Sequence, residues 1–594
     1  MALDGVGNAR EDGSAKVPSI TATQSKKWVL VEGASDGCEA ARELGESLDI
    51  HPITAQLLLN RGVRTPAEAL EFLYPSLDDL HDPFLLPDAE KAVDRILRAI
   101  LEQETIFVHG DYDVDGVTSA ALFTRVLRKL GANVIPFVPC RSREGYGVRI
   151  ATIEKAHQDG AGLVITCDCG ISANDACERA VELGLDLIVT DHHQCQATLP
   201  PAYAVVNPSR KDSRYPFADL AGVGVAYKIC QALCIKRNID LQGLHKHFLD
   251  LVALGTVSDV ASLTGENRAY VYHGLRSIAD SKKEGLKALI AASGLLSADV
   301  DTEDIGFRLG PRINAAGRLA EASTALELFL TADADVAKRI AEEMSACNLE
   351  RQSEQQRILL EALQALAEDD LYDHKVLIVG REGWHPGVIG IVAGRLAEDF
   401  YRPAIVFTVK DGAYHGSGRS IPGFNLAKAI EEIGSDLVHG GGHAMAAGIS
   451  FSTDSLQVVR EKFNRLADQW LTEEDLSPSI QVELEVDSDE ISIDLGREIG
   501  RFAPFGEGNR QPMLMSTGVR FVDIRTMGSN GKHLRARVSG KRSPVSVIGW
   551  GMGEDAGRLN PSVDYNICYN LSVSRFNGTE RVELILQDAP QEAL

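Results

Sequence analysis

The sequence predicts an α/β protein of several domains, and three patterns along the chain carry this prediction. Between Thr105 and Val206, short β-branched apolar runs alternate with amphipathic stretches, as in a parallel sheet covered by helices. Residues 333–371 contain few helix breakers and predict one long helix, which a second α/β pattern follows. From about Gln481, short alternating segments predict a small β-barrel or sandwich. A chain of 594 residues has room for all of these parts.

Composition narrows the class of protein. Hydrophobic residues make up 44% of the chain and charged residues 24%, which is ordinary for soluble globular domains. No apolar run approaches the ~20 residues of a membrane span, and the polar N-terminal residues lack the pattern of a signal peptide. The ten cysteines show no disulfide-like spacing, which fits a reducing compartment. We therefore expect a cytoplasmic protein that makes no membrane contact.

The net charge of -25 argues only superficially against a nucleic-acid partner. A basic groove can coexist with an acidic body, and carboxylates gathered at a metal site add negative charge that bound cations offset. Charge must therefore be considered region by region.

The first chemical motif lies where the predicted strand 105–108 gives way to the predicted helix 118–130. Ligands of open α/β sheets bind at the carboxyl ends of strands. Four potential metal ligands stand there: His109, Asp111, Asp113 and Asp115. The run of alternating aspartates also imitates half of a calcium loop, but Leu122 stands where that loop needs Glu. A solvated acidic turn is the remaining alternative for this motif alone.

Two further strand ends carry the same kind of side chain. The predicted strand 163–167 ends at Asp168, and the strand 187–190 is followed by Asp191, His192 and His193. Parallel strands end at one edge of a sheet, so solvated turns are a poor explanation for three such ends. Cys167 and Cys169 flank Asp168, but the alternation of an extended chain points them away from it, which favours packing over zinc. Asp259, in an otherwise apolar segment, is a further candidate ligand because a buried carboxylate needs a partner.

In this order, these motifs resemble the DHH phosphoesterase superfamily. Within it, the chain from about residue 50 onward is similar to bacterial exonucleases specific for single-stranded DNA. Four segments carry that likeness: 108–116 (VHGDYDVDG), 144–147 (EGYG), 310–318 (GPRINAAGR) and 384–390 (WHPGVIG).

The resemblance implies two α/β domains, a DHH domain with a parallel sheet and a DHH-associated domain, joined by a long helix, and a C-terminal OB-like β-barrel. We expect a loose tail over 1–50, a helical lead-in and the DHH domain over 51–330, the connecting helix over 331–372, the DHH-associated domain over 373–475 and the barrel over 476–594.

Carboxylates and imidazoles without thiolates suit two Mn²⁺ or Mg²⁺ ions, which support phosphodiester hydrolysis. The family pattern implies that one ion is held by His109, Asp113 and Asp168, and the other by Asp115, Asp168, His192 and Asp259. It leaves His193 to contact the scissile phosphate, with Asp111 and Asp191 as groups that orient the ligands.

Substrate contacts are expected from three regions. Arginine forks suit a 5′-terminal phosphate, so Arg141 together with Arg312 or Arg318 is the candidate for it, and Asn314 is a further substrate-binding candidate. The resemblance adds Arg419 and the Gly-rich segment with Gly441, Gly442 and His443. From the residues alone, residues 440–442 are equally a turn or an anion-binding nest before a helix-like stretch.

The barrel region holds the densest basic cluster of the chain. It comprises Arg520, Arg525, Lys532, Arg535, Arg537 and Lys541. These residues predict a groove for single-stranded nucleic acid, the alternative being a solvated face.

The residues and the resemblance together predict a monomeric, metal-dependent exonuclease that degrades single-stranded DNA. The resemblance alone implies the 5′ to 3′ direction, the role in recombination and repair, and a single-strand-binding protein and a helicase as partners. DHH hydrolases of small nucleotides generally lack a barrel, and an inactive replication scaffold would have lost metal ligands that this chain retains. Both alternatives are therefore less favoured.

Overall fold

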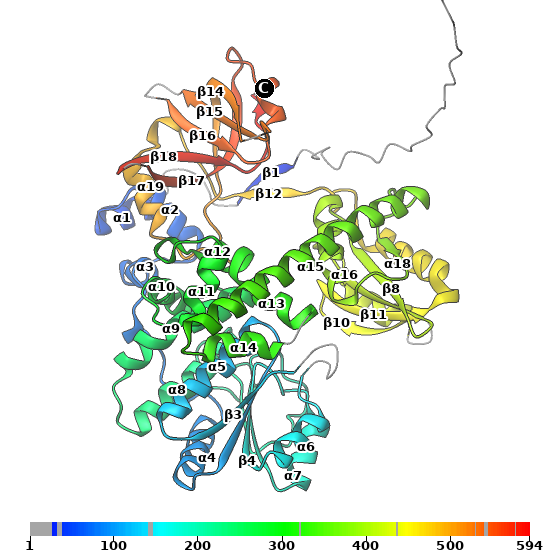
Figure 1. Cartoon of the computed structure of the whole chain (residues 1–594). Coiled ribbons are helices and arrows are strands. Elements are labelled where there is room, and N and C mark those ends of the chain that lie inside the picture. The colour runs from blue at the N-terminus through cyan, green and yellow to red at the C-terminus, as the bar shows by residue number, and fades with distance from the viewer. Residues whose placement is uncertain are drawn as a thin grey trace, which may run out of the picture. The chain divides into compact units, whose positions relative to one another are not determined.

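The computed structural model describes residues 26–31, 39–139, 147–319, 322–434, 438–528, 530–539, 544–576 and 578–593 (Figure 1). The chain forms two compact units. One comprises Val29–Glu350 and Gln481–Leu594, and the other comprises Arg351–Ile480 with the N-terminal residues up to Trp28. Among the described residues, no helix has the length and apolarity needed to cross a membrane.

A five-stranded parallel sheet forms the centre of the first unit, as predicted. Its strand order is β3-β2-β4-β5-β6. The strands are β2 (Thr105–Gly110), β3 (Asn133–Phe137), β4 (Ala161–Cys167), β5 (Asp186–Thr190) and β6 (Ala204–Val206). Their continuous apolar runs are buried because helices cover both faces of the sheet.

Helices form a layer on each face of this sheet (Figure 1). One face packs against α4 (Ala89–Leu101), α5 (Val114–Lys129) and α8 (Gly222–Lys236), and the other against α6 (Ile150–Gln158) and α7 (Asn174–Glu182). The predicted start of α5 at Thr118 is wrong. The helix begins at Val114 because the Asp113 carboxylate accepts a hydrogen bond from the Gly116 N–H, at 3.1 Å, and caps it. Asp115 therefore stands on the first helical turn.

Further helices complete the DHH region. They are α9 (Leu241–Ser258), α10 (Gly265–Ala279), α11 (Glu284–Ala292), α12 (Thr302–Asp304), α13 (Gly310–Leu319) and α14 (Ala322–Leu330). Helix α9 packs against α5, α8 and α10, and it is buried along its second half. The long helix expected as a connector is α15 (Ala334–Glu368), whose residues belong to both units.

The N-terminal segment corrects the expected loose tail over residues 1–50. Residues 39–48 form α1, whose Ala41 and Leu44 are buried. Lys27–Leu30 form β1, which pairs with β12 (Ser479–Val482). With α2 (Pro52–Asn60) and α3 (Pro66–Leu73), α1 shares a hydrophobic core with the C-terminal barrel, and this burial orders it.

The C-terminal region is the predicted OB-like barrel. Its sheet closes because β14 pairs with both β15 and β17. Its elements are β13 (Leu484–Glu485), α19 (Ile493–Gly500), β14 (Leu514–Met527), β15 (His533–Ser539), β16 (Val545–Gly549), β17 (Tyr565–Phe576), β18 (Thr579–Leu586) and β19 (Gln591–Glu592).

The second unit is the other predicted α/β domain. Its five-stranded sheet has the order β10-β11-β9-β8-β7, and only β7 and β8 are parallel. The strands are β7 (Leu377–Gly380), β8 (Ala404–Lys410), β9 (Ala413–Arg419), β10 (Val438–Gly442) and β11 (Ala446–Ser452). The helices are α16 (Pro386–Phe400), α17 (Leu426–Ile433) and α18 (Leu456–Trp470). The helix-like stretch expected after the glycines is instead a hairpin turn leading into β11.

Candidate active site

Three aspartates extend the ladder of the parallel sheet beyond the ends of its strands. The N–H of Asp111 donates to the carbonyl of Cys167, that of Asp168 to Thr190 and that of Asp191 to Val206. The strands β2, β4 and β5 are neighbours, so these carboxylates meet at one edge of the sheet. This is the arrangement that the sequence predicts.

Helices bring the remaining acids to the same edge. Asp113 and Asp115 start α5, and Asp259 caps the C-terminal end of α9. The Asp115 carboxylate accepts hydrogen bonds from the backbone N–H groups of Gly222, at 2.6 Å, and Val223, at 2.8 Å, where α8 begins. The start of α8 thus fixes the position of Asp115. In the sequence, only the presence of Gly222 could have pointed to this contact.

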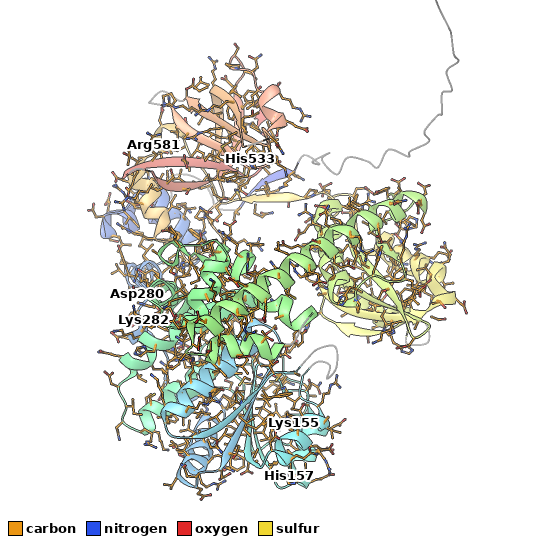
Figure 2. The ribbon with its side chains drawn as sticks, in the orientation of Figure 1. Lys155, His157, Asp280, Lys282, His533 and Arg581 are labelled. Carbon is orange, nitrogen blue, oxygen red and sulfur yellow. The ribbon has the colours of Figure 1, made fainter. Side chains whose placement is uncertain are left out.

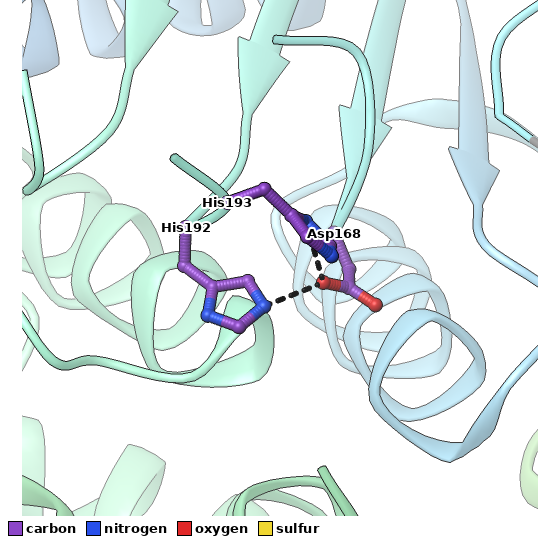
Figure 3. Close-up of side chains that lie close together, drawn as sticks. All are labelled: Asp168, His192 and His193. Atoms are coloured by element: carbon purple, nitrogen blue, oxygen red, sulfur yellow. Dashed lines mark ion pairs between the residues drawn. The ribbon is translucent and has the colours of Figure 1, made fainter. Parts of the chain in front are cut away.

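His192 and His193 close the cluster (Figure 3). His192 Nε2 lies 3.1 Å from Asp168 Oδ1 and 3.6 Å from Asp259 Oδ2, while His193 Nδ1 lies 3.8 Å from Asp168 Oδ1. Ligand atoms of three overlapping groups are close enough to hold a cation. The groups are Asp168, His192 and His193; Asp115, His192 and Asp259; and Asp111, Asp113 and Asp168.

Several buried polar atoms at this edge lack a hydrogen-bond partner among the described residues. They are both ring nitrogens of His109, Asp111 Oδ1, Asp168 Oδ1 and His192 Nε2. An unsatisfied buried polar atom is costly, and a cation would satisfy acceptors and ring nitrogens together. The residues present therefore fit a metal site. Cys167 and Cys169 are buried beside it but belong to none of the three groups.

The electrostatics of the cluster also favour cations. Burial, followed by repulsion from neighbouring carboxylates, raises the pKa of Asp115 and Asp168 well above its usual range. Burial, followed by repulsion from the Asp113 carboxylate, raises the pKa of both Asp111 and Asp259 to about 7. Burial lowers the pKa of His109 and His192 to about 4, so both rings are neutral and can coordinate metal.

Asp191 and His193 differ from the rest of the cluster, because they form a pair of an ionised carboxylate and a charged ring. The His193 ring donates through Nδ1 to Asp191 Oδ1 at 2.7 Å, and this hydrogen bond raises the pKa of His193 to about 9 against the opposing effect of burial. Burial alone would raise the pKa of Asp191, but His193 and the backbone N–H of Ile171 lower it. His193 is thus held as a cation, and its side chain is 42% exposed.

The expected substrate contacts are distributed over both units. Arg312 and Asn314 lie half-buried on α13, and Arg318 belongs to the same helix. Arg312 donates to the Ser345 hydroxyl at 3.2 Å and to the Arg308 carbonyl at 2.6 Å. Arg141 and the side chain of Arg318 lie outside the described residues.

The Gly-rich segment belongs to the second unit. Gly441 and Gly442 end β10, and His443 lies exposed in the turn to β11. Gly442 has a φ of 156°, and a Cβ there would stand 2.3 Å from the Ala446 carbonyl oxygen, so this tight hairpin requires glycine. Arg419 ends β9 and contacts the Ser417 hydroxyl and the Gly418 carbonyl.

The barrel carries a hollow of about 950 Å³ over β14, β15, β16 and β18. The predicted residues Arg525, Arg535 and Arg537 line it, and Arg581, which the sequence analysis missed, joins them (Figure 2). Arg520 does not line it and instead pairs with Asp564 at 2.6 Å. Lys532 lies exposed in the turn between β14 and β15, and Lys541 lies outside the described residues.

Comparisons with known proteins agree with this fold and site. Residues 105–256 match the DHH family, N-terminal domain, residues 373–473 the DHHA1 domain, and residues 482–588 the RecJ OB domain. The sheet with its acidic edge is thus that of a DHH phosphoesterase.

Relatives and solved structures narrow the class. The single-stranded-DNA-specific exonuclease RecJ of Bacillus subtilis is 37% identical over 93% of this chain and 69% of its own length, and that of Escherichia coli is 34% identical over 92% and 98%. The crystal structure of RecJ from Thermus thermophilus in complex with Mn²⁺ matches with a TM-score of 0.80 and 30% identity, over 95% of this chain and 79% of that one. The chain belongs to the RecJ family of single-stranded-DNA-specific exonucleases. This confirms the enzyme class expected from the sequence, an exonuclease specific for single-stranded DNA.

Proposed function

We propose that this chain is a metal-dependent exonuclease that removes nucleotides from single-stranded DNA in the 5′ to 3′ direction, in recombination and repair. The observation that carries the proposal is the set of buried, partnerless imidazole and carboxylate atoms, among the described residues, at the ends of three adjacent strands. RecJ structures of Thermus thermophilus contain Mn²⁺ or Mg²⁺, which suit this set of ligands.

Two overlapping ligand sets account for the cluster. We assign His109, Asp113 and Asp168 to one ion and Asp115, Asp168, His192 and Asp259 to the other. The second set contains the close group Asp115, His192 and Asp259, and the first draws on Asp113 and Asp168 with the free ring nitrogens of His109. When bound, the ions lower the pKa of water and stabilise charge on the phosphate that is cleaved.

The protein's own contribution is to position the phosphate and the ligands. Asp191 holds His193 Nδ1, so Nε2 of the charged ring is free to donate a hydrogen bond to a phosphate oxygen. The backbone N–H groups at the start of α8 keep the Asp115 carboxylate in place, and Asp111 is assigned as a group that orients the ligands beside it.

Arginine and glycine-rich segments are proposed to bind the 5′ end of the strand. Arg141, Arg312, Asn314 and Arg318 are assigned to the terminal phosphate, and Arg419 with Gly441, Gly442 and His443 to the strand that follows. In support, no carboxylate among the described residues lies within ion-pair distance of Arg312 or Arg419, so both guanidinium groups are available to an anion. If this holds, the 5′-phosphorylated substrate is preferred over the 5′-hydroxyl substrate, and Arg141→Ala or Arg312→Met removes the preference.

The barrel groove is proposed to hold the strand. Arg525 and Arg535 stand directly opposite each other on β14 and β15. Like charges in that position destabilise a sheet, which favours a role in binding a polyanion.

The wider setting of the reaction is also a proposal. We assign the chain to the cytoplasm and expect it to act as a monomer, because one chain supplies all the ligand groups. A helicase and a single-strand-binding protein are fitting partners, because the substrate must first be separated from its complement.

Incubation with Mn²⁺ and oligonucleotides labelled at either end, single- or double-stranded, DNA or RNA, tests the function. We expect single-stranded DNA to lose mononucleotides from its 5′ end and chelation to stop the loss. Release from the 3′ end, or equal cleavage of duplex DNA, would contradict the proposal.

A further inference from the structure

A second hollow, of about 850 Å³, lies away from the metal cluster. It is bordered by the first half of α9, the ends of α10 and α5, and the residues that begin α11, and we call it the α9–α11 pocket. Figure 2 labels Asp280 and Lys282, which line it. Lys246 of this pocket and Asp259 of the metal cluster are separated by about 20 Å of helix at 1.5 Å per residue. The volume is that of a site for a small organic ligand.

The lining of the α9–α11 pocket is rich in positive charge, although the chain as a whole carries -25. Its basic side chains are Arg125, Lys129, Lys246, Arg276, Lys282 and Lys283, and three histidines accompany them. Two of its four acids are already neutralised, since Asp250 pairs with Lys283 and Glu284 with Lys287, both at 2.7 Å. Five cations therefore face only Asp78 and Asp280.

Those five cations have no acidic partners among the described residues. Within that part of the chain, no carboxylate lies within ion-pair distance of Arg125, Lys129, Lys246, Arg276 or Lys282. Arg125 is half-buried, and its Nε donates to the Phe329 carbonyl at 2.7 Å. Burial, and then repulsion from the surrounding lysines, lowers the pKa of the neighbouring His247. Asp250 offsets part of the cost of burying Arg125, but it also pairs with Lys283, so the five cations still exceed the acids that face them. This excess of positive charge indicates that an anion completes the pocket.

The floor of the pocket is held in place. Lys283 Nζ bonds both carboxylate oxygens of buried Asp250, and Ser281 Oγ donates to Asp250 Oδ2 at 2.8 Å. Helix α11 begins at Glu284, beside the pocket, and no side chain caps it. Uncapped amides at a helix start suit phosphate, as does the Arg125 fork.

We propose that the α9–α11 pocket binds a phosphate-bearing ligand of nucleotide size. Two sources carry this chemistry. One is the free nucleoside monophosphate that exonucleolytic cleavage releases, and the other is the backbone of a DNA strand that lies across the surface. The site is independent of the metal ligands, so binding there requires no divalent ion.

The test is a binding titration in EDTA at low salt, with thymidine 5′-monophosphate and thymidine as probes. We expect the monophosphate to bind and thymidine not to bind. The double variant Lys246→Glu, Lys282→Glu reverses the charge of two exposed lysines of the pocket. We expect it to weaken monophosphate binding at least tenfold. Lys155→Glu, on α6 and away from the pocket, is the control for a single charge reversal, and the single variant Lys246→Glu is compared with it (Figure 2). A second variant, Arg125→Gln, checks the result without charge reversal.

A second titration, with oligothymidylate lacking terminal phosphates, identifies the source. If the ligand is the free nucleotide, the double variant loses monophosphate binding and keeps the affinity and salt slope for DNA. If the ligand is the strand, the salt slope for DNA falls by ~0.7 for each phosphate that the variant no longer neutralises. The proposal is overturned if neither affinity changes beyond the change in Lys155→Glu, or if a glutamate peptide competes as well as the monophosphate. Cleavage of very short oligonucleotides in Mn²⁺ should be unchanged in these variants.

Discussion

Asp168 adopts a backbone conformation that L-residues rarely occupy, with a φ of 61° directly after β4. Such strain persists where the surrounding structure fixes it, and here it turns the carboxylate toward both His192 and His193. Asp168 is also the only aspartate present in two of the three close ligand groups, whereas Asp111 belongs to one. The two residues should therefore differ in importance.

Replacement of these two aspartates tests the difference. We expect Asp168→Ala to reduce Mn²⁺-dependent exonuclease activity to assay background, because both proposed ions lose a ligand. Asp111→Ala should cost about 10–100-fold, as is usual for groups that orient ligands. Steady-state rates and Mn²⁺ titrations of both variants measure this, and near-normal turnover in Asp168→Ala would exclude its assignment to both ions.

The raised carboxylate pKa values predict how Mn²⁺ stabilises the fold. In the metal-free protein, Asp111 and Asp259 have a pKa of about 7, above the ordinary carboxylate value of 3.8, so the folded state loses stability as pH rises from about 4 to about 7 and loses no more above that. A bound cation favours the ionised form of both groups, Asp259 as a proposed ligand and Asp111 as a close neighbour of the ligands. Between pH 6 and 8, each carboxylate gains about tenfold in ionised fraction, so stabilisation by Mn²⁺ held well above its Kd at every pH should grow by about 2–3 kcal/mol.

Thermal unfolding with and without Mn²⁺ at pH 6, 7 and 8 measures this growth, and Mg²⁺ serves as a second ion. Asp111→Asn should reduce the pH dependence, because one of the two titrating groups is gone. A metal-induced gain in stability that is equal at all three pH values would contradict the protonated state of the cluster.

Elements far apart in the sequence determine what the sequence analysis could and could not predict. The positions of Asp168 and of Asp191 to His193 follow from strand ends, because β4 and β5 end at the predicted residues. The start of α8 was missed as part of the site, because Gly222 contacts Asp115 only after the chain has crossed the sheet. The hairpin of β10 and β11 was missed because small residues fit a helix as well as a turn.

Gly222 provides a test of the α8 contribution. A Cβ at this position would stand 2.7 Å from Asp168 Oδ1 and 2.8 Å from Asp115 Oδ2. Gly222→Ala should therefore displace both carboxylates, weaken Mn²⁺ binding and lower activity, while DNA binding by the barrel is retained. Gly243→Ala, on α9, is the matched control because its Cβ would meet no atom within 4 Å. Equal activity of the two variants would show that the start of α8 does not fix the site.

The arginines on the barrel strands allow a second prediction about individual elements. Arg535 and Arg537 point to the same side of β15 and line the groove. The variant Arg535→Glu, Arg537→Glu should weaken binding of long single strands and lower the logarithmic salt slope by about 1.4, if each arginine contacts one phosphate. Arg520→Glu is the informative control, because Arg520 pairs with Asp564 outside the groove. Equal losses in both variants would indicate a general effect of charge.

At the scale of the whole chain, the barrel and the DHH region belong to one unit, and the barrel shares a hydrophobic core with the N-terminal helices α1, α2 and α3. Sequence patterns predict the elements of each region, but the partner of an apolar helix face is a property of the tertiary fold. Ala41, Leu57 and Leu73 of the N-terminal helices pack with barrel residues, so removal of the barrel would expose them. Truncation near Ser477 therefore changes stability together with DNA binding, and point variants of the groove separate the two effects.

Arg268, buried on α10, links these regions. Its guanidinium donates to the carbonyl oxygens of Phe72, Phe502, Pro504 and Ala503, and it lies 4.2 Å from the centre of the Phe72 ring. Burial lowers its pKa to about 10, so it remains charged at neutral pH. Its loss would leave several carbonyl groups without their donors.

We expect Arg268→Met to lower the free energy of unfolding by about 3 kcal/mol. The effect should be much smaller in a chain that ends at Ser477, because only the Phe72 carbonyl would remain as an acceptor. Arg276→Met, an exposed arginine on the same helix that stacks on Tyr272, is the matched control and should change stability little. Denaturant unfolding of the unsubstituted chain and of Arg268→Met, each with and without the barrel, measures the coupling, and Arg276→Met is compared with the full-length chain. An Arg268→Met cost that is the same with and without the barrel would show that this arginine stabilises α10 alone and does not join the two regions.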